Sequence, residues 1–173
     1  MLVLGGARSG KSAFAERIAA ECGEPVLYVA TGLPLDDEMA ERIRRHQARR
    51  SSAWRTLEAP RHVADAVQAQ LGDARTVLLE DLTLLLSNVS VAEDVARAEI
   101  DALFGLPAHA VLVSNEVGMG IVPEYPLGRA FRDALGRLNQ HAAATADEVY
   151  LLVAGLPLRL KPGADRPTLT REA

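Results

Sequence analysis

Several features that mark other classes of protein are scarce in this chain of 173 residues. Its single cysteine, Cys22, excludes an internal disulfide framework and fits a reducing compartment. No run of about 18 apolar residues occurs, so no membrane span is expected. The N-terminal stretch MLVLGG lacks the basic segment of a secretory signal. These features together indicate a cytoplasmic protein.

Positive charge is also not in excess, because the net charge is −4 and the isoelectric point is about 5.6. A protein that binds the nucleic-acid backbone along its surface needs the opposite balance, so that class is disfavoured. Lysine is rare as well. Lysine and arginine together number 19, and only Lys11 and Lys161 are lysines. A lysine that persists in so arginine-rich a chain is expected to have a specific task.

Apolar runs alternate with helical patterns along the chain, which predicts an α/β fold with a mostly parallel central sheet and helices on both faces. We expect a single catalytic domain over residues 1–161 and a polar tail over 162–173. The expected strands lie at 2–4 and 26–30 and begin near residues 76, 109 and 148, and the expected helices lie at 11–22, 37–50, 61–71, 92–104 and 127–146.

The stretch GGARSGKS, which ends in Lys11 and Ser12, matches the pattern G-x-x-x-x-G-K-[ST] between an expected strand and an expected helix. Glycines let such a loop wrap a phosphate group, and backbone N–H groups at the helix N-terminus bind the anion. The lysine reaches the β- and γ-phosphates, and the serine hydroxyl is a ligand for Mg²⁺. The loop therefore predicts a nucleotide site of the P-loop class.

Two adjacent acidic residues, Glu80 and Asp81, lie at the end of the apolar strand expected at TVLLEDL. P-loop nucleotide sites use a strand-end acid to hold Mg²⁺, directly or through water. Either carboxylate fits that role, and the alternative is an acid that caps a helix or a turn. Glu116, at the end of the next expected strand, is a further and less specific candidate.

The densest basic patch, RIRRHQARR, contains a histidine, His46. On a helix, Met39, Ile43 and His46 form one stripe, which turns the histidine inward. Arg42 and Arg49 are then its neighbours, and nearby cations favour the neutral, nucleophilic imidazole. Such a group can attack an α-phosphorus, which predicts a nucleotidyl-histidine intermediate. The residues alone also permit a structural histidine beside a solvated basic face.

These motifs, taken in order, resemble one family, the bifunctional adenosylcobinamide kinase/adenosylcobinamide-phosphate guanylyltransferases of cobalamin biosynthesis. The resemblance runs from GGARSGKS through YVATG, DDEMAERIRRHQARR and ADEVYLLVAG to AGLPLRLK, nearly the whole chain. H-Q-x-R-R followed by W-x-x-x-E and NEVGxGIVP is its most specific part. It implies a RecA-like P-loop fold and assembly as a homotrimer.

The resemblance implies two reactions. ATP or GTP phosphorylates the hydroxyl of the aminopropanol arm of adenosylcobinamide. GTP then guanylylates a histidine, which His46 matches, and the GMP passes to the new phosphate to give adenosylcobinamide-GDP. The implied cofactors are GTP, ATP and Mg²⁺. The competing interpretations are a plain P-loop small-molecule kinase and a nucleotide-dependent switch, both with a structural His46.

The candidate site residues come from the loop motif and from the resemblance. We assign Mg²⁺ to Ser12 and Asp81, with the choice between the two acids open. The loop VGMGIVPEYPLG is expected to belong to the corrinoid pocket or to a subunit contact, or to be an ordinary connection. The residues expected to bind the nucleotide are Gly5, Gly6, Ala7, Arg8, Ser9, Gly10, Lys11, Ser12, Thr31, Gly32, Leu33, Gln47, Ala48, Arg49, Arg50, Glu58 and Glu80.

Overall fold

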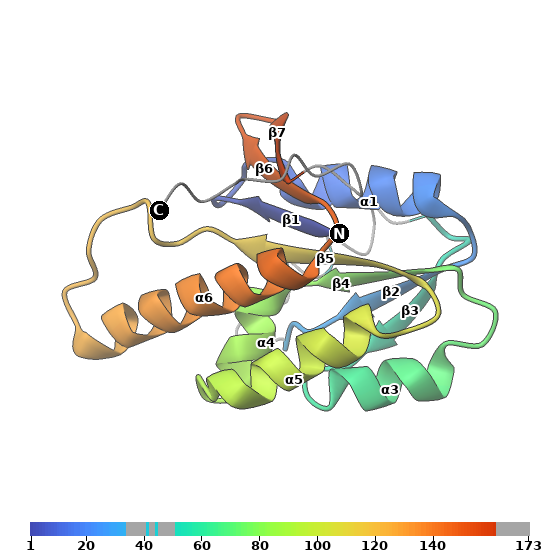
Figure 1. The fold of residues 1–173 in the computed structure, drawn as a ribbon, viewed down its shortest axis with the longest axis horizontal. Coiled ribbons are helices and arrows are strands. Elements are labelled where there is room, and N and C mark those ends of the chain that lie inside the picture. The colour runs from blue at the N-terminus through green and yellow to red at the C-terminus, as the bar shows by residue number, and fades with distance from the viewer. Residues whose placement is uncertain (34–40, 42–43, 45–50, 162–173) are drawn as a thin grey trace, which may run out of the picture.

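The computed structural model describes residues 1–33, 41, 44 and 51–161, and these build one seven-stranded sheet (Figure 1). The strand order is β3-β2-β4-β5-β1-β6-β7, and every neighbouring pair is parallel except β6 and β7. The strands are β1 (Leu2–Gly5), β2 (Val26–Ala30), β3 (Arg55–Glu58), β4 (Thr76–Glu80), β5 (His109–Asn115), β6 (Val149–Val153) and β7 (Leu156–Lys161).

Helices cover both faces of the sheet because successive strand residues point to opposite sides and most of them are apolar. On β1, Val3 packs with the residues of α1 (Lys11–Cys22), whereas Leu2 and Leu4 pack with the helices of the other face. Among the described helices, Figure 1 shows only α1 on one face of the sheet. The described helices of the other face are α3 (Val63–Gln70), α4 (Leu82–Asn88), α5 (Glu93–Phe104) and α6 (Pro126–Thr145).

The predicted fold class is confirmed as a mostly parallel α/β sheet of the RecA-like P-loop kind. The strand β5 lies between β1, which leads into the phosphate loop, and β4, which carries the acids. Most expected strands and helices are present within a few residues of their predicted bounds. The helix expected over 37–50 and the tail over 162–173 fall largely or wholly outside the described residues, although Glu41 and Arg44 are both helical.

Three short elements were not predicted. In β3 only Leu57 is buried, so the strand shows no apolar run. The strand expected at TVLLEDL stops at Glu80, and α4 begins at Leu82. In β7 the leucines alternate with other residues, but their side chains are exposed. The strand therefore lacks the buried apolar side that a half-buried strand usually has. Each of these elements depends on neighbours distant in sequence.

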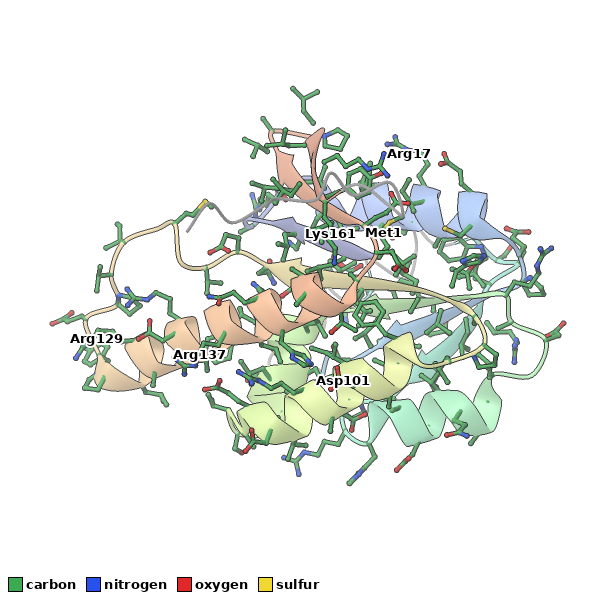
Figure 2. The ribbon with its side chains drawn as sticks, viewed as in Figure 1. Met1, Arg17, Asp101, Arg129, Arg137 and Lys161 are labelled. Carbon is green, nitrogen blue, oxygen red and sulfur yellow. The ribbon has the colours of Figure 1, made fainter. Side chains whose placement is uncertain are left out.

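Helices α5 and α6 are joined by polar contacts as well as by packing. Arg137 of α6 donates to both carboxylate oxygens of Glu93, at 2.9 and 2.5 Å. His141 Nε2 lies 2.7 Å from Asp101 Oδ1 of α5. Figure 2 labels Arg137 and Asp101 along this contact. Exposed pairs of this kind contribute little energy, so buried residues such as Ile100 and Leu138 supply most of the packing stability.

The parallel strands bring their carboxyl ends to a single edge of the sheet. Gly5 at the end of β1 is in register with Asn115 at the end of β5, and Ala30 of β2 is in register with Glu80 of β4. The connection between β5 and α6 projects beyond this edge at the left of Figure 1. Open parallel sheets bind their ligands at this edge, so the candidate residues that end these strands lie where a site is expected.

Candidate functional site

The phosphate loop joins β1 to α1 in a compact turn. Ser9 N donates to Gly6 O at 3.2 Å, and two residues, Arg8 and Gly10, have left-handed φ values of 57° and 94°. Gly10 is the residue before the first turn of α1 and carries no side chain that could cap it. The first N–H groups of α1 are therefore accessible to an anion, as a bound nucleotide phosphate requires.

Gly5 has to be a glycine because the chain approaches it from two sides. A Cβ atom there would lie 2.4 Å from Ser9 Oγ and 2.9 Å from the carbonyl oxygen of Leu152. The second contact comes from backbone in the neighbouring strand β6, which cannot move aside easily. The start of the loop is thus closely packed against the sheet.

The lysine of the loop is almost fully enclosed. Lys11 is 5% exposed, and its Nζ donates to Gly6 O at 3.4 Å across the loop. An ammonium group held there faces the position that the phosphates of a nucleotide occupy in such a loop. Its burial explains why arginine, which is bulkier and forked, does not replace lysine at this point of an arginine-rich chain.

The serine of the loop meets the acid pair. Ser12 Oγ donates a hydrogen bond to Glu80 Oε1, which brings α1 and β4 together. Burial raises the pKa of Glu80 from 4.5 to about 7, the charge of Asp81 adds to the rise, and the Ser12 hydrogen bond and Lys11 oppose it. The carboxyl group is therefore close to half-protonated at neutral pH.

A hydroxyl and a carboxylate are oxygen ligands of the kind that Mg²⁺ takes together with waters and nucleotide phosphates. Among residues 1–33, 41, 44 and 51–161, no group of three or more His, Cys, Asp or Glu side chains converges on a point. Ser12 and Glu80 therefore fit Mg²⁺ that arrives with a nucleotide, rather than an ion enclosed by protein ligands alone.

Asp81 is occupied differently from its neighbour. Its side chain accepts a hydrogen bond from Leu84 N at 2.9 Å and so caps α4, and its Oδ2 accepts from Asn115 Nδ2 at 3.0 Å. It is 5% exposed. The helix-capping role considered for these acids applies to Asp81, and the geometry favours Glu80 as the carboxylate beside the Ser12 hydroxyl.

Thr31 is fully buried and holds the backbone of the acid pair in place. Its Oγ1 donates towards the carbonyl oxygens of Glu80 and Asp81, at 3.1 and 2.9 Å, and accepts from Asp81 N at 2.8 Å. Asn88 Nδ2 in turn donates to Thr31 O at 2.8 Å. Thr31 was expected to line the nucleotide site, and the structure places its side chain against the strand that carries the acids.

Asn139, which the sequence did not single out, and the weaker acid candidate Glu116 support this arrangement. Asn139 of α6 accepts from Ser114 Oγ at 2.7 Å and donates to Asn115 O at 3.1 Å, inside the protein. Glu116 N donates to Gly5 O at 3.0 Å, which fixes the start of the phosphate loop. The Glu116 carboxylate accepts from Gly118 N at 2.6 Å and so begins the connection to α6. No sequence motif marks Asn139, because its partners come from another part of the chain.

The remaining candidates lie further along the same edge or outside the described residues. Glu58 ends β3 and is exposed, and Leu33, just beyond β2, is 36% exposed. Four strand spacings separate β3 from β1, which corresponds to roughly 19 Å at about 4.8 Å per strand. The candidates that lie outside the described residues are His46, Gln47, Ala48, Arg49 and Arg50.

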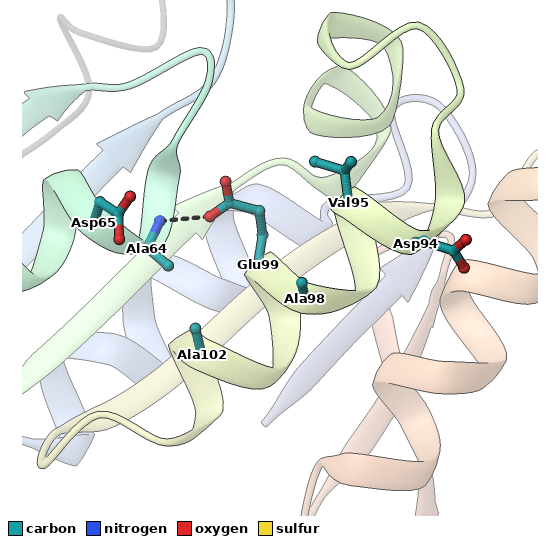
Figure 3. A pocket seen from close by; sticks show the side chains of 7 residues that line it. All are labelled: Ala64, Asp65, Asp94, Val95, Ala98, Glu99 and Ala102. Atoms are coloured by element: carbon teal, nitrogen blue, oxygen red, sulfur yellow. Dashed lines mark hydrogen bonds between the residues drawn. The ribbon is translucent and has the colours of Figure 1, made fainter.

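A shallow depression between α3 and α5 does not resemble a nucleotide site. Figure 3 shows that Asp65, Asp94 and Glu99 line it together with alanines and a valine. Glu99 accepts from Val63 N and Ala64 N at 3.2 and 2.6 Å, so its charge caps the N-terminus of α3. Acidic walls of this kind repel phosphate.

Within the described chain, no helix is both long and apolar enough to cross a bilayer.

Comparison with known proteins places these residues in a wider context. The family model described as cobinamide kinase / cobinamide phosphate guanyltransferase matches residues 1–160. The chain is 43% identical over 180 residues to the bifunctional adenosylcobalamin biosynthesis protein CobU of Escherichia coli K12, covering 93% of this chain and 99% of that protein. It is 44% identical over 166 residues to the protein CobP of Pseudomonas aeruginosa, covering 92% of this chain and 96% of the relative.

Among solved structures, the P4 protein from bacteriophage phi6 in complex with ADP is similar, with a TM-score of 0.45 and 14% identity over 91% of this chain and 51% of that chain.

Proposed function

The chain belongs to the cobinamide kinase / cobinamide phosphate guanyltransferase family, and from that premise we propose how its residues divide the two reactions. The protein is a bifunctional kinase and nucleotidyltransferase of adenosylcobalamin biosynthesis, rather than a plain P-loop kinase or a nucleotide-dependent switch. We propose that one catalytic domain over residues 1–161 carries both activities, because one continuous sheet runs from β1 to β7.

The kinase reaction is assigned to the phosphate loop and the acid beside it. Backbone N–H groups of the loop and Lys11 would hold the nucleotide phosphates. Ser12 and Glu80 would hold Mg²⁺, which shields the charge of the transferred phosphoryl group. The γ-phosphoryl group then passes to the aminopropanol hydroxyl of adenosylcobinamide. The contact between Ser12 and Glu80 is the observation that carries this assignment.

The guanylyl transfer is assigned to His46. The imidazole would attack the α-phosphorus of GTP and release pyrophosphate, and the GMP would then pass to the phosphate made in the first reaction. Arg49 and its neighbours in RRHQARR would bind the phosphate oxygens. Glu58 and Thr31 to Leu33 are assigned to the guanine nucleotide. The wide spacing between β3 and β1 supports separate positions for the two nucleotides.

One labelling experiment tests this division of labour. The protein is incubated with GTP labelled at the α-phosphate and then denatured, and we expect label that is labile in acid and stable in base. The His46→Asn variant should take up no label yet retain kinase activity. His62→Asn is the matched control, because His62 is exposed and its φ of 51° suits asparagine. Equal labelling of His46→Asn and wild type would contradict the assignment of His46.

We also propose that the protein assembles as a homotrimer. Leu156, Leu158 and Leu160 of β7 are 73%, 57% and 52% exposed on an edge strand. Contiguous exposed apolar side chains of this kind are typical of subunit contacts. Met119 and Ile121, in the connection to α6, are 80% and 96% exposed and are assigned to the corrinoid pocket or to the same contact. Light scattering on wild type and Leu158→Lys tests the trimer, which the variant should weaken.

The preferred donor of the kinase step is a separate question with a direct measurement. We propose that either ATP or GTP serves, because the phosphate loop contacts the phosphates that both share. Initial rates of adenosylcobinamide phosphorylation with each nucleotide should both be measurable. A rate with one nucleotide that does not exceed the background would show that the base is also selected.

A further inference from the structure

The turn between β6 and β7 lies directly against the phosphate loop. Gly155 N donates a hydrogen bond to Ser9 O at 2.9 Å. A Cβ atom built on Gly10 would lie 3.3 Å from Gly155 Cα, so the two backbones nearly touch. At the other end of the loop, Leu152 of β6 is in register with Gly5 and packs closely against it. One hairpin therefore contacts the loop at its beginning and at its end.

The hairpin has the geometry needed for so close an approach. Val153 pairs with Leu156, so the turn contains only Ala154 and Gly155. Their φ values are 52° and 82°, and two left-handed residues in succession are typical of a type I′ hairpin turn. Gly10 lacks a side chain, which leaves room for the Gly155 backbone, and Gly155 readily adopts the left-handed φ that the turn requires. The contact thus depends on two glycines that lie 145 positions apart.

The hydrogen bond determines which way one peptide group of the loop faces. The peptide between Ser9 and Gly10 is trans, so its carbonyl oxygen and its N–H point in opposite directions. Gly155 holds the carbonyl oxygen on the side of the hairpin. The Gly10 N–H consequently points away from the hairpin. Without that hydrogen bond, the peptide would be freer to rotate and to turn the N–H away from a phosphate.

We propose that Gly155 is a positioning residue for nucleotide binding: its N–H anchors the Ser9–Gly10 peptide so that the phosphate loop is preorganised for the anion. This inference rests on the proposed use of the loop for nucleotide phosphates. Preorganisation strengthens binding because less conformational freedom is lost when the ligand arrives. The hairpin would act on the phosphate end of any nucleotide, whatever its base.

The sharpest test removes the N–H and little else. Glycolic acid replaces Gly155, which exchanges the amide for an ester, and binding of ATP, GTP and inorganic tripolyphosphate is measured by calorimetry. We expect all three to bind roughly three- to tenfold more weakly, since one hydrogen bond that orders the loop is lost. The same exchange at Gly72 is the control, because that glycine is also exposed and left-handed, at φ 54°, but lies in the turn before β4.

Two ordinary substitutions give a second line of evidence. Gly155→Ala has room for its Cβ but strains a φ of 82°, so it should weaken binding of the three ligands by a common factor. Both variants keep the N–H, but asparagine tolerates the left-handed conformation better than alanine does, so Gly155→Asn should keep most of the wild-type affinity. Thermal unfolding of both variants, and of Gly72→Ala, separates a loss of anion affinity from a general loss of stability.

The outcomes are distinguishable. Unchanged affinities in the ester-containing chain overturn the positioning role while leaving the nucleotide site intact. Weaker binding of ATP and GTP with unchanged binding of tripolyphosphate also overturns it, since the hairpin would then act on the nucleoside. Failure of the wild-type protein to bind any of the three ligands would instead count against the proposed function of the loop.

Discussion

The Ser12 hydroxyl donates its hydrogen bond to a carboxylate 68 positions away, that of Glu80. Ser12 lies in the first turn of α1, which follows β1, and Glu80 ends β4, and β5 lies between these two strands. Helix α1 crosses β5 and reaches β4, and so closes the gap. The contact brings Glu80 beside the phosphate loop, where its carboxylate can bind the same Mg²⁺ ion as Ser12. This pair is the centre of the predicted kinase site.

The Glu80→Gln variant should lose most of the kinase rate and its dependence on pH. Burial raises the pKa of Glu80 to about 7, and Mg²⁺ requires the carboxylate form. The wild-type rate at limiting Mg²⁺ should therefore rise as pH increases through about 7 and level roughly one pH unit above that value. The variant should be slower by about a hundredfold, with a flatter profile. Glu116→Gln is the control, and an unchanged profile in Glu80→Gln would contradict the assignment.

The same carboxyl group should make folding stability depend on pH when metal and nucleotide are absent. The pKa of Glu80 is near 7 in the folded protein and is 4.5 ordinarily. Between these two pH values the carboxyl group has lost its proton in the unfolded state but keeps it in the folded state. Stability is therefore greatest below the ordinary value and falls as pH rises through the folded pKa, by up to about 3 kcal/mol. Urea unfolding of wild type and Glu80→Gln across this range isolates the effect, because the variant cannot titrate there. Parallel pH curves for the two proteins would refute it.

Asp81 should contribute to stability more than to metal binding. Asp81→Ala removes the cap of α4 and the partner of Asn115, so we expect a loss of about 1–2 kcal/mol. Asp81→Asn keeps an oxygen for the Leu84 N–H and should lose less. Calorimetric titration of Mg²⁺ in the presence of nucleotide should show a smaller effect for Asp81→Asn than for Glu80→Gln. The reverse order would identify Asp81 as the principal metal ligand.

Asn139 is predicted to hold α6 against the end of β5. Asn139→Ala leaves the Ser114 hydroxyl and the Asn115 carbonyl without their partner in a buried region, at a cost of about 1–3 kcal/mol. Thermal unfolding should show a midpoint lower by roughly 3–10 °C. Gln140→Ala is a neighbouring exposed control on the same helix and should change little. Equal midpoints for the two variants would contradict the role of Asn139.

Much of the fold was predictable because apolar residues dominate the central strands. Runs such as Val26 to Ala30 are buried on both faces, and a strand of that kind is apparent from composition alone. The phosphate loop was equally plain, since its glycines and Lys11 satisfy local backbone and phosphate chemistry. The strands β3 and β7 were not predicted, because their outward-facing side chains carry no burial signal.

The sequence by itself determined the order of the apolar central strands and of most helices, the phosphate loop and the presence of two acids at the end of β4. It did so because each of these depends on residues that are close together along the chain. Only the tertiary structure decided that Glu80 meets Ser12 while Asp81 caps α4, and that Gly155 reaches Ser9. Those choices depend on which strand lies beside which, and the packing of distant segments around one core determines that order.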